Sequence, residues 1–185
     1  MAIYLTHSNR VINFQEPGKS DIHIDDIVHH LSMIPRFGGK LDRHYSVLDH
    51  SVYVGMIAKT FLKADDETAF AALMHDAQEA FLGDIPSPLK SLLPDYKEIE
   101  KSFEKVIQEK FNISMSETIK DLVKYADLLA LKAEKEAFIN TPIEQECHWQ
   151  YLHELPLVPM SPIDFCVNSK ELFFQAFDYY RKNRE

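Results

Sequence analysis

An imidazole and a carboxylate, His75 and Asp76, follow directly after the apolar run of residues 69–74. A second carboxylate, Glu79, comes one helical turn later. Polar side chains that follow a core-like run are costly to bury unless something satisfies them. A divalent metal ion would satisfy His75 and Asp76 together, so we look for its remaining ligands elsewhere in the chain.

His50 is a candidate for a third ligand. Its spacing from Val47 and Val54 places it on the apolar face of a predicted helix. An imidazole that points inward is, without other information, more often a hydrogen-bonded core histidine than a metal ligand. Both interpretations of His50 stay open when it is considered alone.

Asp127 would complete the ligand set. It shares a predicted helical face with Val123 and Ala130, and taken alone it favours an ion pair with Lys124 one turn earlier. Two imidazoles and two carboxylates from three apolar helices are harder to explain as structural residues. They match a mixed nitrogen and oxygen site for a divalent ion, with positions left open for water and substrate.

Apolar residues at helical spacing predict the elements that position these groups. The first predicted helix runs from Asp21 or Asp25 to about Leu31, and the last begins at Ser161 or Asn168. Between them we predict four helices, over about residues 46–62, 67–81, 96–111 and 116–138. Residues 3–5 and 10–14 are predicted to form a β-hairpin, and the proline-containing residues 140–160 an irregular segment. The sequence therefore predicts one all-α domain over residues 1–185 with a small N-terminal hairpin.

Composition narrows the functional class. A formal net charge of −9 argues against a broad nucleic-acid interface, because the phosphate backbone requires basic surface. The two cysteines give no disulfide framework, and no apolar run approaches the roughly 18 residues of a membrane span. We therefore expect a cytoplasmic protein that binds neither nucleic acid nor membrane. The aromatic C-terminal helix suggests a homo-oligomer.

His50, the His75–Asp76 pair and Asp127 together resemble the H…HD…D signature of the HD-domain metal-dependent phosphohydrolases, a family of helical bundles. The run from Leu73 to Lys90 is similar to the corresponding run in small bacterial 5′-deoxynucleotidases. It also resembles phage HD enzymes that act as deoxyadenosine triphosphate triphosphohydrolases. The resemblance extends from about residue 24 to residue 137.

The resemblance implies that His50, His75, Asp76 and Asp127 bind one divalent transition metal, which could be Co, Mn, Zn or Fe. A second Mg or Mn ion could arrive with the substrate phosphates. Glu79 would assist proton transfer beside the metal.

The resemblance also implies a substrate site. Arg36 would orient the phosphate, because its planar guanidinium suits phosphate oxygens. Phe37, which stands where those deoxynucleotidases carry tryptophan, would pack on the sugar or base. The other substrate-binding candidates are Gly38, Gly39, Asp84, Ile85, Pro86, Ser87, Lys90 and Lys97. For His44 a phosphate contact, a proton donor and a residue without function stay open.

We expect hydrolysis of deoxynucleotides, with dATP converted to deoxyadenosine and triphosphate, and dADP or dAMP as further substrates. The preference for a triphosphate depends on the phage-like residues 35–39 and on Lys90. The first alternative is a 5′-deoxynucleotidase that acts on deoxynucleoside monophosphates. An alternative of another class is a non-catalytic module that binds nucleotides.

Overall fold

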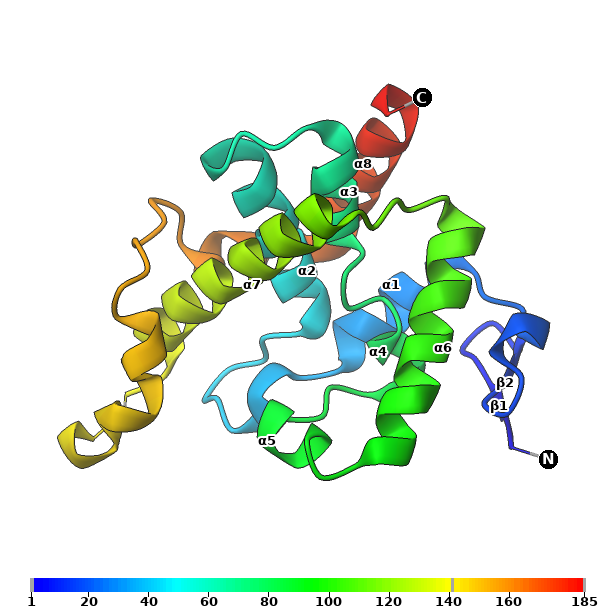
Figure 1. Cartoon of the computed structure of the whole chain (residues 1–185), viewed down its shortest axis with the longest axis horizontal. Coiled ribbons are helices and arrows are strands. Elements are labelled where there is room, and N and C mark those ends of the chain that lie inside the picture. Colours follow the sequence, from blue (N-terminus) through cyan, green and yellow to red (C-terminus); the bar gives the residue numbers. More distant parts are fainter. Residues whose placement is uncertain (1, 141, 185) are drawn as a thin grey trace.

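The computed structural model describes residues 2–140 and 142–184, and this part of the chain is helical apart from one two-stranded sheet (Figure 1). The α-helices are α1 (Ile24–Met33), α2 (Val47–Met56), α3 (Asp66–Leu73), α4 (Glu79–Leu82), α5 (Ser87–Lys90), α6 (Pro94–Phe111), α7 (Glu117–Phe138) and α8 (Ser169–Asn183). Short 3-10 segments cover Pro17–Lys19, Arg36–Gly39, Ile143–Leu152 and Pro162–Phe165, and a π-helical turn covers Ile57–Phe61. The all-α prediction is confirmed, whereas the single domain stays a prediction.

The predicted N-terminal hairpin is present. Strands β1 (Ile3–Leu5) and β2 (Val11–Asn13) are antiparallel, with Tyr4 opposite Ile12. Ile12 is fully buried in the core, and Tyr4 is exposed. The hairpin therefore packs on the helical core through the face of β2 that carries Ile12.

A buried carboxylate joins this hairpin to α1. The Oδ2 atom of Asp26 accepts hydrogen bonds from the hydroxyls of Thr6 and Ser8, at 2.9 and 2.6 Å. Its Oδ1 atom accepts from the backbone N–H of Ser8 at 3.1 Å. Both carboxylate oxygens thus have donors, as buried polar atoms in folded proteins usually do.

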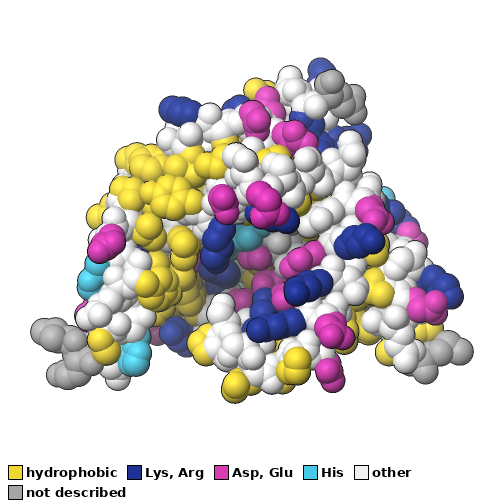
Figure 2. All heavy atoms as spheres, in the orientation of Figure 1, with side chains coloured by type: hydrophobic (Ala, Val, Ile, Leu, Met, Phe, Trp, Pro, Cys, Tyr) yellow, Lys and Arg dark blue, Asp and Glu magenta, His cyan; other side chains and the backbone are white. Residues whose placement is uncertain are grey.

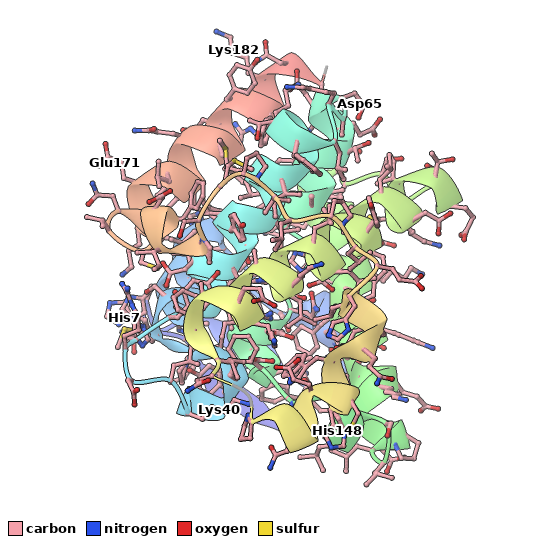
Figure 3. The ribbon with its side chains drawn as sticks, turned by 90° about the vertical axis from the view of Figure 1, so that its left-hand side faces the viewer. His7, Lys40, Asp65, His148, Glu171 and Lys182 are labelled. Carbon is pink, nitrogen blue, oxygen red and sulfur yellow. The ribbon has the colours of Figure 1, made fainter. Side chains whose placement is uncertain are left out.

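Helix α2 is the centre of the fold. Residues 47–55 are all buried, and the helix packs against α1, α3, α7 and α8. Figure 1 shows α7 crossing α2, and Figure 3 shows the fold from the side, with Glu171 and Lys182 of α8 far from the segment around His148. A polar residue on α2 is therefore surrounded by helices and must find its partners inside the protein.

Local sequence signals fix where α2 begins. The hydroxyl of Ser46 accepts from the backbone N–H of Asp49, and the Asp49 carboxylate accepts from the backbone N–H of Ser46. This reciprocal capping box satisfies N–H groups that a helix start leaves without partners. The predicted start at residue 46 is confirmed. The regular helix, however, ends at Met56, and a π-turn replaces the predicted α-helix up to residue 62.

Gly55 allows α2 and α3 to pack closely. A Cβ atom at this position would lie 3.3–3.4 Å from the Cα, Cβ and Cδ1 atoms of Leu73. Such contacts are tighter than most Cβ contacts in proteins, so a larger residue would require Leu73 to give by a few tenths of an ångström.

The helix predicted over residues 67–81 is wrong in its second half, because α3 ends at Leu73 and α4 begins at Glu79. In a continuous helix the carbonyl of Ala72 would accept from the backbone N–H of Asp76. Here Nδ1 of His75 bonds that carbonyl at 2.8 Å instead. The backbone closes tighter turns, in which the N–H of Ala77 donates to the carbonyl of Met74. His75 and Asp76 therefore lie on a turn between two helices.

The C-terminal part shows two further differences. The segment predicted to be irregular contains the ten-residue 3-10 segment Ile143–Leu152. Ser161 does act as an N-cap, but only of the 3-10 turn. Helix α8 begins at Ser169, directly after its N-cap Asn168, which is the other predicted start. A further difference concerns the start of α1, near the N-terminus. Its N-cap is His23 rather than the expected Asp21 or Asp25, and the His23 side chain accepts from the backbone N–H of Asp25.

Several aromatic residues of α8 belong to the protein's own core. Phe173, Phe177 and Tyr180 are buried, while Tyr179 is 53% exposed. In the part of the chain described, none of the helices combines the length and apolarity needed to cross a membrane.

Candidate metal centre

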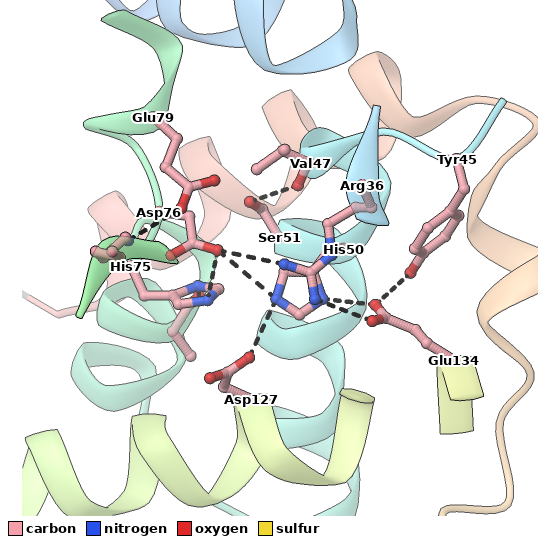
Figure 4. A network of polar contacts seen from close by, with 12 residues as sticks. Arg36, Tyr45, Val47, His50, Ser51, His75, Asp76, Glu79, Asp127 and Glu134 are labelled. Atoms are coloured by element: carbon pink, nitrogen blue, oxygen red, sulfur yellow. Dashed lines mark hydrogen bonds and ion pairs between the residues drawn. The ribbon is translucent and has the colours of Figure 1, made fainter. Parts of the chain in front are cut away.

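Four predicted ligands converge from three parts of the fold (Figure 4). His50 comes from α2, His75 and Asp76 from the turn after α3, and Asp127 from α7. One ligand atom from each of His50, His75 and Asp76 lies within 4.8 Å of the others. The Nε2 atom of His50 is 3.3 Å from Oδ1 of Asp127 and 3.7 Å from Oδ2 of Asp76. The ion pair considered as the alternative for Asp127 is also present, since Oδ2 of Asp127 is 2.8 Å from Nζ of Lys124.

The two imidazoles are oriented with their Nε2 atoms toward this cluster. Nδ1 of His50 bonds Oε1 of Glu134 at 2.6 Å, and Nδ1 of His75 bonds the carbonyl of Ala72 at 2.8 Å. Both Nε2 atoms are buried without a hydrogen-bond partner in the described residues. Metal-bound histidines commonly use the second ring nitrogen in this way. The donor set therefore fits a divalent ion of the transition series.

Electrostatics concentrate negative charge around these nitrogens. Burial raises the pKa of Asp76, but His75 and His50 outweigh it and hold the value at about 2. Burial likewise opposes ionisation of Asp127, whose pKa His50 nevertheless holds well below the ordinary range. Burial and Arg36 lower the pKa of His50, yet Glu134 and Asp127 raise it to about 9. The cluster thus stabilises positive charge at its centre.

Arg36 lies beside the cluster and is positioned by the segment Arg36–Gly39. Its Nη2 atom donates to Oε2 of Glu134 at 3.0 Å, and Nη1 is 4.0 Å from Oδ2 of Asp76. Phe37 and Gly38 have positive φ angles of 56° and 62°, which turn the chain sharply after the arginine. Such a conformation is unfavourable for Phe37 and indicates a locally constrained loop.

A cavity of about 310 Å³ opens beside the metal cluster and extends between α6 and α7. Figure 2 shows the hollow in this face, with acidic, basic and histidine side chains gathered in it. Its lining includes His75, Asp76 and Asp127 together with apolar side chains of Met74, Ile107, Ile113, Met115 and Val123. Its size is at the lower end of small-molecule sites, which span roughly 300 to 1,000 Å³.

The predicted substrate residues divide into two groups. Lys90 lines the cavity, and its Nζ atom lies 2.5 Å from Oε1 of Glu100. The other predicted substrate residues are not among those that line it: Arg36, Phe37, Gly38, Gly39, Asp84, Ile85, Pro86, Ser87 and Lys97. Asp84 is nevertheless near enough for its charge to act on Arg36 and Glu79. His44 is exposed, and its Nε2 atom bonds the carbonyl of Ser32 at 3.0 Å.

Comparison with known proteins decides the family. A family model described as 5′-deoxynucleotidase YfbR-like matches residues 24–141. The chain is similar to the uncharacterized protein YfdR of Escherichia coli, with 37% identity over 168 residues and 88% of each chain covered. It is also similar to the uncharacterized protein RCAP_rcc00048 of Rhodobacter capsulatus, with 30% identity over 138 residues, 70% of this chain and 69% of the relative.

The chain belongs to the YfbR-like 5′-deoxynucleotidase family. It is therefore an enzyme, an HD-type phosphohydrolase, and the predicted family resemblance is confirmed. Enzymes of this type use divalent metals, and the cluster of His50, His75 and Asp76 is able to bind one.

Glu79 reaches the same region in a different way from that predicted. It is the first residue of α4 rather than a continuation of the helix that precedes His75. Its side chain is buried, Oε1 is 3.9 Å from Nζ of Lys90, and Oε2 has no hydrogen-bond partner in the described chain. Burial, with the charges of Asp76 and Asp84, raises the pKa of Glu79 to about 10.

Sequence reasoning missed two residues of this site, Glu134 and Tyr45. Glu134 is fully buried on α7, and its Oε1 atom accepts from the Tyr45 hydroxyl at 2.7 Å. A signal was available, because Glu134 follows Asp127 by seven residues, or two helical turns, and falls on the stripe of Ala126 and Ala130. An acid on an apolar stripe needs a buried partner, and His50 and Arg36 are those partners.

Proposed function

We propose that this enzyme is a metal-dependent 5′-deoxynucleotidase that releases inorganic phosphate from deoxynucleoside monophosphates. The observation that carries the choice of a monophosphate is the pairing of the lysines around the cavity. Lys90 pairs with Glu100 at 2.5 Å, Lys120 with Glu117 at 2.6 Å, and Lys124 with Asp127 at 2.8 Å. A triphosphate would need further cations for its β- and γ-phosphates, and these lysines already have acidic partners.

In this proposal His50, His75, Asp76 and Asp127 hold the metal ion. When bound, a divalent ion polarises the phosphoryl group and lowers the pKa of a water molecule, which supplies the nucleophile at neutral pH. The buried Nε2 atoms of His50 and His75 lie 3.3 and 3.1 Å from carboxylate oxygens of Asp127 and Asp76, which supports this assignment. Cobalt, manganese, zinc and iron all suit such nitrogen and oxygen ligands.

Arg36 binds the phosphoryl oxygens in this proposal. Glu134 neutralises part of its charge and holds one of its terminal nitrogens, which leaves Nη1 directed toward the region of Asp76. A preorganised guanidinium stabilises the charge that develops on the phosphoryl group without moving during the reaction.

Glu79 delivers a proton to the departing 5′-oxygen. Its buried position next to the cluster, with one carboxyl oxygen lacking a partner among described residues, supports this role. Asp84, two residues after the end of α4, accepts a hydrogen bond from a sugar hydroxyl. The apolar part of the cavity, which includes Met74 and Ile107, offers a surface for the nucleoside.

We also propose a cytoplasmic homo-oligomer that acts on small molecules rather than on nucleic acid. The net charge of −9 supports a small phosphorylated substrate over a polynucleotide. Light scattering of the purified protein tests the oligomer.

The decisive experiment measures the products formed from each deoxynucleoside and ribonucleoside mono- and triphosphate with Mn, Co, Zn or Mg. We expect phosphate and deoxynucleoside from the monophosphates. Release of triphosphate from dATP at a higher kcat/KM would favour the triphosphate reaction predicted from the sequence. Equal rates on ribonucleotides would refute the preference for deoxy sugars, and no turnover with any metal would favour a binding module.

A further inference from the structure

Glu134 is a buried charge at the centre of three contacts. It has no exposed surface, Oε1 accepts from the Tyr45 hydroxyl at 2.7 Å and faces Nδ1 of His50 at 2.6 Å, and Oε2 accepts from Arg36 at 3.0 Å. A carboxylate in such a position costs free energy unless its partners are well placed.

The contact with His50 determines which ring nitrogen faces the cluster. With the proton of the neutral imidazole on Nδ1, where Glu134 accepts it, the lone pair on Nε2 is directed toward Asp76 and Asp127. The opposite tautomer would place a proton on Nε2 and leave no lone pair for a metal ion.

The contact with Arg36 determines the direction of the guanidinium. One terminal nitrogen is held by Glu134, and the other lies 4.0 Å from Asp76. Arg36 and His50 are on different elements, the loop before α2 and α2 itself, and Glu134 reaches both from α7.

We propose that Glu134 is a positioning residue that aligns the metal-binding nitrogen of His50 with the phosphate-binding guanidinium of Arg36. The inference concerns the same site as the proposed 5′-deoxynucleotidase activity and rests on it for the role of Arg36. A purely structural role, in which Glu134 only ties α7 to the loop, would affect stability and leave metal and phosphate binding unchanged.

The variant Glu134→Gln distinguishes the two roles because an amide has one acceptor oxygen. If that oxygen faces His50, the amide NH₂ group faces Arg36, which loses its acceptor. If the amide is reversed, the NH₂ group donates to Nδ1 of His50 and the ring proton moves to Nε2. Either orientation disrupts one of the two alignments.

Two binding measurements follow the two alignments. Co²⁺ affinity is measured by competition with a chelator, and the affinity of the Co²⁺-loaded protein for inorganic phosphate is measured by calorimetry. If the amide NH₂ group faces His50, we expect E134Q to weaken Co²⁺ binding by about 10- to 100-fold, as loss of a hydrogen bond to a metal-bound histidine does. If the NH₂ group faces Arg36 instead, we expect E134Q to weaken phosphate binding by about tenfold.

Glu136→Gln is the matched control. It removes the same charge two residues later on the same helix, where Glu136 is exposed and pairs with Lys135. We expect both affinities of E136Q to stay within about twofold of the wild type. Values for E134Q within that range would overturn the proposal.

A measurement on the wild-type protein covers the case in which E134Q does not fold. Nitrogen-15 NMR of the histidines in the zinc-loaded protein reports which ring nitrogen of His50 carries a proton, with His50→Gln for assignment. We expect a proton on Nδ1 and zinc on Nε2. The reverse would overturn the proposal. These readouts use only metal and phosphate, so a failure of the proposed substrate class leaves them intact.

Discussion

Two of the regions in which the described chain buries polar groups differ in the partners that these groups have. Below the hairpin, each oxygen of Asp26 accepts a hydrogen bond from Thr6 or Ser8. At the centre of the fold, Nε2 of His50 and Nε2 of His75 make no hydrogen bond within the described part of the chain and face carboxylate oxygens of Asp127 and Asp76 at 3.3 and 3.1 Å. Because unpaired buried polar atoms are costly, a folded chain retains them where something outside the chain supplies the partner. The first cluster therefore serves stability and the second indicates a ligand.

The largest effect expected from this difference is on turnover. Asp76→Asn removes a carboxylate ligand but keeps the size of the side chain, so we expect metal-dependent hydrolysis to fall by roughly a thousandfold, because the metal supplies several kcal/mol of charge stabilisation. Phosphate release from deoxynucleoside monophosphates measures it. Activity of D76N above about a tenth of the wild type would remove Asp76 from the metal site.

Asp26→Ala should lower the stability of the fold and leave metal binding and turnover unchanged. Thr6 and Ser8 lose their buried acceptor, which we expect to cost about 3 kcal/mol and to lower Tm by roughly 6–12 °C. Metal affinity and kcat should stay within about twofold of the wild type, because the bonding partners that the structure gives for Asp26 are Thr6, Ser8 and Arg10 rather than any candidate metal ligand. Thermal unfolding and a metal titration of the same preparation test both parts. A D26A protein that lost metal binding while folded would break the comparison.

Metal binding should stabilise the native fold. At a free concentration of about 100 Kd, a ligand that binds only the folded state adds about 2.7 kcal/mol, which corresponds to an increase in Tm of roughly 5–11 °C. Differential scanning calorimetry with Mn²⁺ or Co²⁺ measures this shift. D76N should show little of it, and D26A should show all of it from a lower starting Tm. An equal shift in D76N would mean that the stabilising ion binds elsewhere.

The smallest effect concerns acid pH. Burial raises the pKa of Asp26, but hydrogen bonds from Ser8 and Thr6 outweigh it and leave the value below that of an ordinary aspartate. Because the folded-state pKa is depressed, the stabilisation is present above the unfolded value of about 3.9 and is lost as the pH falls through the folded value. The difference in Tm between wild type and Asp26→Asn should therefore shrink below about pH 4. A difference independent of pH would show that the charge of Asp26 contributes nothing.

Much of the candidate site could be predicted from the sequence because apolar periodicity revealed where polar residues enter the core. His50 and Asp127 interrupt apolar stripes on α2 and α7, and their spacing alone predicts that both lie on inward faces. The structure brings His50 within 3.3 Å of Asp127, although these residues are 77 positions apart.

Other features could not be predicted because they depend on contacts between elements. The end of α3 at Leu73 reflects competition by the His75 side chain for a backbone carbonyl, and helix propensity carries no such information. The ion pair between Lys90 and Glu100 joins α5 and α6, so the acidic partner of Lys90 could not be predicted from the sequence alone. The partners of Glu134 likewise become visible only when α7 is packed against α2.

Gly55 sets how closely α2 and α3 approach each other beside the candidate metal ligands. It allows α3 to approach α2 closely at Leu73, immediately before the turn that carries His75 and Asp76, while His50 is five residues earlier on α2 itself. The approach of His50 to the turn that carries His75 and Asp76 is thus linked to a glycine that is not one of the candidate ligands. A Cβ atom at this position would require Leu73 to give by a few tenths of an ångström, so the geometry of the candidate ligands depends on backbone spacing as well as on donor atoms.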